Sequence, residues 1–282
     1  MKGRKIYFPR ADKAWEETND IRVNGYLNVL RFTKSTYHET AVSIALGGEI
    51  PYLKKNQFKR TRISPEKNLA YACGLYYEEY MFDSETEFIQ NVIKNLKMRI
   101  VLVILYKNDA NLGTEPVPVV CCGYDYDEDA FIIIDVQDGT TKNMNVEECS
   151  LFEGQNKLLM LNVPGMVNMK ELEENYVISI ATKLFIRRFF SFINAQVGDF
   201  CGISLFKYCL ERGLKPIEIP GFQEHAKWQL QWLSYVMEYG NRIGSKELSL
   251  IQYIQQLYQA IGNDEYKKWL EVCLNEYNTN NR

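Results

Sequence analysis

One segment of the chain, residues 117–136, constrains the fold more than any other. It reads VPVVCCGYDYDEDAFIIIDV, two apolar runs separated by an acidic link. The link YDEDA has the length and polarity of a β-hairpin loop. The run from Ile100 to Tyr106 is apolar at both alternating positions, which is typical of a central strand buried on both faces. With a further apolar run at residues 158–163, these segments predict a β-sheet.

A helix is predicted just before the central strand. In DSETEFIQNVIKNL, the residues Phe88, Val92 and Leu96 recur every four positions, which places them on one helical face. Asp83 or Ser84 is suited to cap the first turn of this helix. Other helices are expected near the start of the chain, at about residues 20–32 and 37–46, and the second of these ends at Gly47-Gly48.

The pattern of apolar residues changes near Pro164-Gly165. From residue 168 onward apolar residues recur at three- and four-residue spacing, with almost no alternation of the kind that strands show. The fold class predicted for the whole chain is therefore α+β. Its two domains are an α+β domain at residues 1–165 and a helical domain at residues 166–282.

Composition excludes several classes of protein. The net charge is -3 with both signs interspersed, so no basic surface for nucleic acid is expected. The stretch MKGRKIYFPRADKAWEE lacks the apolar core of a secretory signal, and no window approaches the roughly 18 apolar residues of a membrane span. Seven cysteines without a CxxC pair are typical of a reduced, intracellular chain, so a cytoplasmic location is predicted.

A basic stretch and a group of tyrosines are the candidates for binding. Residues 52–62 contain five basic residues and no acidic residue, and they form either a solvated loop or a surface for an anionic partner. Tyrosines line either a small-molecule pocket or an aromatic core. The binding candidates are Lys54, Lys55, Arg60, Arg62, Tyr76 and Tyr77.

The cysteines are the candidates for covalent chemistry. Cys121 and Cys122 are adjacent in a predicted strand, so their side chains point to opposite faces and cannot enter one pocket. Small core residues are favoured over metal ligands at these two positions, because His38 and His225 are the only histidines. Cys201 stands where a helix is expected to begin, and a helix N-terminus lowers the pKa of a thiol. Cys201 and Cys122 are the candidate nucleophiles, with a buried structural role as the alternative for each.

The remaining polar motifs have structural interpretations. His38 is expected in the first turn of the helix at 37–46, as a surface or capping residue, and His225 is expected on a helix surface. The acidic hairpin lacks the spacing and the glycine of a calcium-binding loop. No GxGxxG, phosphate-binding loop or GxSxG pattern occurs. No metal and no cofactor are expected.

The order of these segments resembles the butirosin biosynthesis acyltransferase family. The resemblance rests on NGYLNVLRF followed by His38-Glu39, on IALGGEIPY, on the helix leading into the central strand, on the hairpin with its Gly-Tyr-Asp corner, and on VGDFCGISLFKYCLE. It implies a papain-like cysteine-peptidase fold followed by a helical region. It also implies transfer of an acyl or aminoacyl group from a carrier-protein thioester to an amine, with a Cys-His-Asp triad.

The triad that the resemblance implies is incomplete in this sequence. The cysteine of the family falls on Ile21, and its histidine falls on Val117. Only the acid is kept, as Asp135. The chain has no cysteine before Cys73 and no histidine near Val117, so a small shift of the alignment does not restore the triad.

Three functions stay open on this basis. The first is a non-catalytic relative that binds a partner, either an acyl or peptidyl carrier protein or an active homologue, with the basic stretch meeting an acidic carrier. The second is an active acyltransferase or peptidase-like enzyme that recruits other groups near Asp135. The third is a small-metabolite-binding protein. The sequence names no substrate, partner or oligomeric state.

Overall fold

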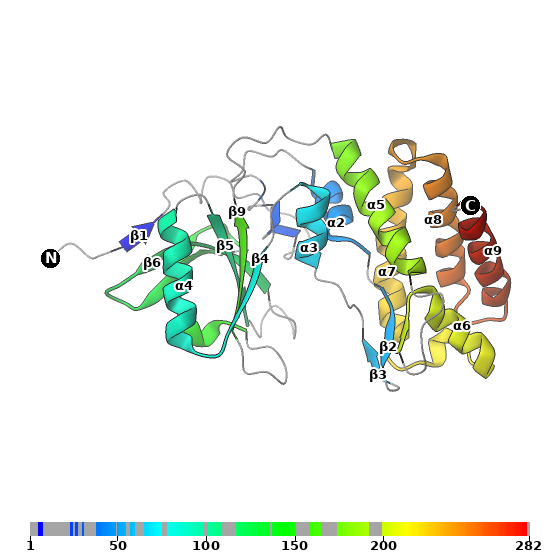
Figure 1. Cartoon of the computed structure of the whole chain (residues 1–282), viewed down its shortest axis with the longest axis horizontal. Coiled ribbons are helices and arrows are strands. Elements are labelled where there is room, and N and C mark those ends of the chain that lie inside the picture. Colours follow the sequence, from blue (N-terminus) through cyan, green and yellow to red (C-terminus); the bar gives the residue numbers. More distant parts are fainter. Residues whose placement is uncertain are drawn as a thin grey trace. The chain divides into compact units, whose positions relative to one another are not determined.

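The structure is a computed structural model of the chain and divides into two compact units (Figure 1). The first unit contains residues 1–42 and 74–171, and the second contains residues 43–73 and 172–282. The described residues are 5–7, 23–24, 26–27, 30, 38–48, 50–54, 57–59, 65–74, 78–98, 101–108, 117–135, 137–150, 158–164, 174–191 and 199–280.

The first unit contains an antiparallel sheet. The strands lie in the order β4-β9-β5-β6-β7-β8, and β1 pairs with β6 beside this path. All of these pairs are antiparallel. The strands are β1 (Lys5–Tyr7), β4 (Glu78–Phe82), β5 (Val101–Lys107), β6 (Val117–Asp125), β7 (Ala130–Ile134), β8 (Thr141–Met144) and β9 (Leu158–Pro164). The α+β class, the central strand and the predicted hairpin are confirmed.

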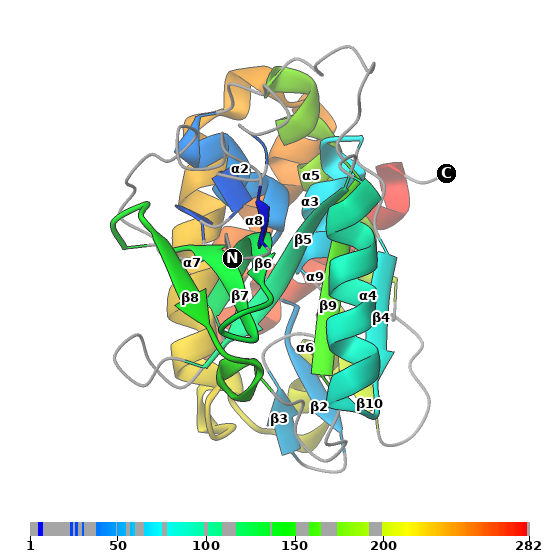
Figure 2. The same ribbon diagram turned by 90° about the vertical axis from the view of Figure 1, so that its left-hand side faces the viewer.

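Helix α4 (Glu85–Met98) covers one face of this sheet (Figure 2). The side chains of Phe88, Val92 and Leu96 are fully buried on it, as their spacing predicts. Ser84 caps the first turn, because its Oγ accepts a hydrogen bond from the Glu87 N–H at 3.3 Å. The helix and the inward side chains of the strands form one apolar cluster. The burial of these apolar side chains makes the main favourable contribution to the folding free energy of the unit.

The helix expected near residue 20 is present where the chain is described. Val23, Asn24, Tyr26, Leu27 and Leu30 are helical, and all five are buried. The next helix, α2 (Glu39–Leu46), also matches its prediction. The exposed His38 stands just before α2 and accepts the Thr40 N–H on its Nδ1 at 3.3 Å, as a capping residue.

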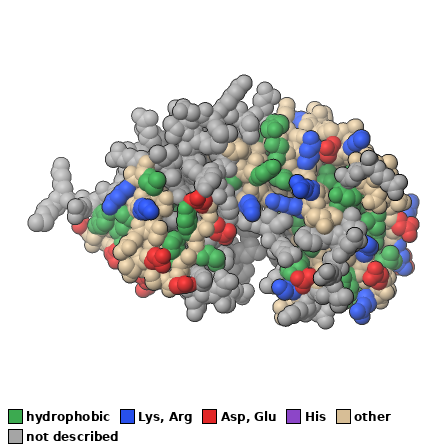
Figure 3. All heavy atoms as spheres, viewed as in Figure 1, with side chains coloured by type: hydrophobic (Ala, Val, Ile, Leu, Met, Phe, Trp, Pro, Cys, Tyr) green, Lys and Arg blue, Asp and Glu red, His purple; other side chains and the backbone are tan. Residues whose placement is uncertain are grey.

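The second unit is mainly helical. Its helices are α3 (Pro65–Ala72), α5 (Glu174–Phe190), α6 (Ile203–Arg212), α7 (Phe222–Glu238), α8 (Ser245–Gln259) and α9 (Glu265–Asn280), with short 3-10 turns at Pro216–Glu218 and Gly240–Arg242. None of the helices in the described ranges has both the length and the apolar character that a membrane crossing requires. Charges of both signs are present on the viewed face of each unit (Figure 3).

Two features of the second unit differ from what the local sequence indicates. A small antiparallel sheet joins β10 (Asp199–Cys201) to β2 (Tyr52–Lys54) and β3 (Gln57–Lys59), although the region after residue 168 shows almost no strand pattern. The prediction of His225 on a helix surface is wrong. Its side chain is fully buried, its Nε2 lies 3.0 Å from the Tyr258 hydroxyl, and aromatic rings surround it. A hydrogen bond and ring contacts offset the cost of burying an imidazole.

Candidate functional site

The frame of the expected triad lies at one end of the β6-β7 hairpin. In this antiparallel pair, Val120 lies opposite Ile134. Val117 begins β6 and Asp135 directly follows β7, so both residues are at the same end of the pair. Ile21, the position of the expected cysteine, is outside the described residues.

Val117 is a core residue. Its side chain is 4% exposed and belongs to the apolar cluster that packs under α4. Every residue of β6 is buried, so the strand has no face open to water at this position. An imidazole in the place of Val117 would enter a packed apolar layer. The residues around Val117 therefore form part of the packed core beneath β6 and do not line a water-filled site.

Asp135 has structural partners for both carboxylate oxygens. Its Oδ1 accepts the Gln137 N–H at 2.8 Å, and its Oδ2 lies 2.9 Å from the Lys142 Nζ. The Asp135 carbonyl also accepts the Gly139 N–H at 2.9 Å. These contacts close the turn between β7 and β8. The retained acid is thus explained by the turn that it stabilises.

The candidate nucleophiles are buried. Cys122 is 1% exposed and stands where the register between β6 and β7 shifts, and its thiol donates to the Ile132 carbonyl at 3.3 Å. Cys201 is 2% exposed and ends β10, with Gly202 between it and α6. The neighbouring Cys121 packs in the apolar cluster. Cys121 and Cys122 are buried thiols in the core, as the strand pattern predicts.

The binding candidates are only partly described. Lys54 is an exposed residue of β2. The other five, Lys55, Arg60, Arg62, Tyr76 and Tyr77, lie outside the described residues. Among the residues that are described, no group of three histidine, cysteine or acidic side chains is placed to hold a metal ion.

The first unit also has an open groove, which was not among the sites predicted from the sequence. It has a volume of about 590 Å³ and is lined by Gln90, Ile93, Lys94, Lys97, Met98 and Tyr126. Met98 is 52% exposed and Tyr126 is 38% exposed. The signal in the sequence is the end of α4, where two lysines and a methionine occupy positions off the buried helical face. Apolar surface bordered by cations is suited to an amphipathic, acidic partner.

Comparison with models of protein families finds no match for this sequence. Comparison with curated proteins finds no significant match either.

Proposed function

We propose that this chain is a non-catalytic, cytoplasmic relative of carrier-protein-dependent acyltransferases, with a papain-like first domain, and that it acts as a binding partner in amide-forming biosynthesis. The observation that carries the proposal is the packing of Val117 in the apolar core. A triad needs a base that exchanges protons with the reacting groups, and a position packed inside an apolar layer is not suited to one.

The state of the cysteines supports the same proposal. All seven are buried, and none of them forms a disulfide. Burial raises the pKa of the Cys121 thiol well above its ordinary value, and it raises the pKa of four others to about 12: Cys73, Cys149, Cys209 and Cys273. A thiol with a raised pKa is almost fully protonated at neutral pH and is a poor nucleophile.

We propose the groove beside α4 as the surface for an acidic carrier protein. Lys94 and Lys97 would face acidic side chains of the carrier, and Met98 with Tyr126 would contact its apolar residues. Such an interface gains association rate from the lysines and stability from the apolar contacts. The basic stretch around Lys54 is a second surface that would attract the same acidic partner.

Two measurements on the folded chain test the absence of catalysis. Titration with a chromogenic disulfide is expected to show no cysteine that reacts faster than a free model thiol, and all seven react after denaturation. Incubation with an acylated carrier protein and an amine is expected to release no carrier above the rate without protein. A fast thiol together with carrier release would establish the alternative, an acyltransferase that uses non-standard residues.

A separate binding experiment tests the partner. An acylated carrier protein is expected to bind with an affinity that falls as salt rises. The double variant Lys94→Glu/Lys97→Glu is expected to weaken binding by about tenfold or more, because the reversed charges would repel the acidic side chains of the carrier. The double variant Lys227→Glu/Lys246→Glu changes the net charge equally, at two exposed positions of the second unit, and is the matched control. Equal binding by all three proteins would rule out the groove.

A further inference from the structure

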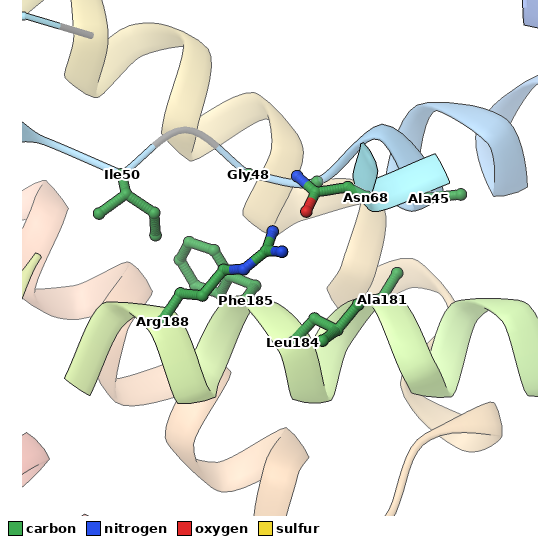
Figure 4. A pocket seen from close by; sticks show the side chains of 9 residues that line it. Ala45, Gly48, Ile50, Asn68, Ala181, Leu184, Phe185 and Arg188 are labelled. Carbon is green, nitrogen blue, oxygen red and sulfur yellow. The ribbon is translucent and has the colours of Figure 1, made fainter. Parts of the chain in front are cut away.

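A small cavity inside the second unit combines apolar walls with polar groups (Figure 4). Helix α5 contributes one face to it, with residues at relative positions 0, 3, 4 and 7: Ala181, Leu184, Phe185 and Arg188. The opposite wall is formed by Asn68 of α3 and by the end of α2, with Ala45, Gly47, Gly48 and Ile50. The volume open to the centre of a water molecule is about 10 Å³, which is room for about one water.

Asn68 presents an acceptor that has no donor in the part of the chain that the structure describes. Its Nδ2 donates to the Leu46 carbonyl at 2.9 Å, at the end of α2. This bond fixes which way the carboxamide faces, because the reverse orientation would set its oxygen against a carbonyl oxygen. The Asn68 residue is only 7% exposed, and its Oδ1 has no hydrogen-bond partner among the described residues. A buried acceptor left unpaired costs about 1–3 kcal/mol.

Arg188 presents a charge that has no counter-charge among the residues described. Its guanidinium reaches from α5 toward Asn68 and Gly48 (Figure 4). The side chain is half-buried, and this burial lowers its pKa from the ordinary value. No carboxylate within the described ranges forms an ion pair with it. A single water would accept a hydrogen bond from Arg188 but would not neutralise its charge.

Further unpaired polar atoms lie behind this wall. Both amide atoms of Gln229 and the Nε1 of Trp232 are buried without a partner within the described part of the chain. Gly48 lets these side chains approach the backbone, since a Cβ there would lie 2.8 Å from the Gln229 Nε2 and 2.8 Å from the Trp232 Cε3. The Trp232 ring also contacts Phe185, with centroids 4.6 Å apart. The Asn68 carboxamide adjoins Gly47 and the Gln229 carboxamide adjoins Gly48, so unpaired polar atoms lie close to this turn, and native proteins rarely leave any.

We propose that this cavity and the Arg188 guanidinium beside it bind the head of a small carboxylic acid that carries a hydrogen-bond donor next to its carboxylate, as hydroxy acids and amino acids do. The hydroxyl or amino group takes the place of the one water for which the cavity has room and donates to the Asn68 Oδ1, and the carboxylate stays outside that volume and pairs with the partly exposed Arg188 guanidinium. Leu184, Arg188 and the two glycines are partly exposed, so the remainder of the ligand extends outward from the cavity. The site lies within the second unit and does not depend on the function proposed for the first.

Binding of glycolate, acetate and inorganic phosphate to the full chain, at constant ionic strength, tests this assignment. Trp232 supplies a fluorescence signal next to the cavity, and thermal unfolding supplies a second readout. Glycolate is expected to bind saturably, and acetate about tenfold or more weakly, because acetate leaves the Asn68 Oδ1 unpaired. Tighter binding of phosphate than of glycolate, or no saturable response to glycolate, overturns the proposal.

Two variants on adjacent positions of α5 assign the charge. Arg188→Met is expected to lose about tenfold or more of the glycolate affinity, the size of effect that a charged hydrogen bond gives. Arg187→Met, at the exposed neighbouring position, is expected to bind glycolate as the unmodified chain does. Equal losses of glycolate affinity in the two variants would mean that the effect comes from the net charge of the helix, and this result would overturn the proposed site.

Chemical modification of the chain without substitutions provides a test that does not depend on whether the variants fold. Glycolate is expected to slow the reaction of Arg188 with phenylglyoxal and to leave the reaction of Arg187 unchanged, as followed by mass spectrometry. Glu49 is next to Gly48 in the sequence and is outside the described residues. If Arg188 is protected without ligand and becomes reactive only in Glu49→Gln, the partner of Arg188 is the chain's own carboxylate and the proposal fails.

Discussion

The turn after β7 in the first unit and the cavity in the second unit use similar polar groups in opposite ways. In the turn, Asp135 has a backbone N–H for one carboxylate oxygen and Lys142 for the other. In the cavity, the Asn68 oxygen has no partner and Arg188 has no counter-charge within the described chain. An acid whose bonds are all local is explained by local structure. Buried groups whose bonds are missing point to a partner that the described residues do not supply.

The largest expected effect concerns the first unit, at Val117. Val117→His is expected to destabilise this unit by about 2–4 kcal/mol, because a larger polar ring would enter a packed apolar layer. Hydrogen exchange of amides in β5, β6 and β7 measures the change within this unit alone. Gln137→His, at an exposed position of the following turn, is the control and is expected to change stability by less than about 0.5 kcal/mol. A neutral Val117→His would show that the position borders an open site after all.

Gly48 tests the packing of the second unit. Gly48→Ala is expected to destabilise it by about 1–3 kcal/mol, because the added methyl group would meet Gln229 and the Trp232 ring at 2.8 Å. The backbone of Gly48 is not in the left-handed region, so this effect is steric. Tryptophan fluorescence during denaturation reports it, since Trp232 adjoins the substituted position.

Gly213 separates steric effects from backbone strain. It has a φ of +66°, and none of the described residues has an atom within 4 Å of an added Cβ. Gly213→Ala is therefore expected to cost about 1–2 kcal/mol through strain alone. Adding Gln229→Ala is expected to reduce the destabilisation caused by Gly48→Ala, because it removes a side chain that the new methyl group meets. It is expected to leave the destabilisation caused by Gly213→Ala unchanged. If Gln229→Ala suppresses neither, the polar cluster is not packed against the Gly47-Gly48 turn.

Much of the fold follows from short stretches of sequence. The face formed by Phe88, Val92 and Leu96 needs only the helical period and a cap at Ser84. The hairpin at residues 117–136 needs only two apolar runs and a polar link. Both signals are local, because the residues that define each element are neighbours in the chain.

The elements that were missed depend on contacts between distant residues. Strand β10 pairs with β2, which is about 150 residues away, and residues 43–73 cluster with the helices that follow residue 172. His225 is buried because Tyr258 and several rings from other elements surround it. A period of 3.6 residues places a side chain on a helical face but does not say what covers that face.

The cavity could not be found from the sequence for the same reason. Arg188 is a charge that interrupts an apolar helix, and Gly47-Gly48 is a helix stop with no phosphate-loop pattern around it. Neither motif indicates a site by itself. The site arises only where α5, α3 and the end of α2 meet, and the missing hydrogen bonds of Asn68 become visible only there.

Removal of the cavity charge is expected to act in the opposite direction to the substitutions at Val117 and Gly48. The pKa of Arg188 is lowered by burial, so folding disfavours its charged form. Arg188→Met is therefore expected to stabilise the ligand-free second unit, by about 0.5 kcal/mol because solvent screens a partly exposed charge. Urea denaturation in the absence of organic acids measures it. A loss of stability would mean that the guanidinium already has a partner.

The smallest effect concerns the turn, where the partners are complete. The pKa of Asp138 is lowered from 3.8 to about 2, first by the Thr140 hydroxyl, then by the Thr140 N–H and then by Lys142. The hydroxyl and the Lys142 Nζ lie 2.6 Å and 3.0 Å from its carboxylate oxygens. A lowered acid pKa gives stability that is present above about pH 4 and is lost as the pH falls toward 2.

The order of these causes can be measured by NMR titration of the Asp138 carboxyl group. Thr140→Val is expected to raise the pKa of Asp138 more than Lys142→Met does, because the hydroxyl is the larger cause. The reverse order would mean that charge dominates over hydrogen bonding in the turn. Lys142 pairs with Asp135 as well as with Asp138, so the charge of this one lysine would then be the main support of the turn.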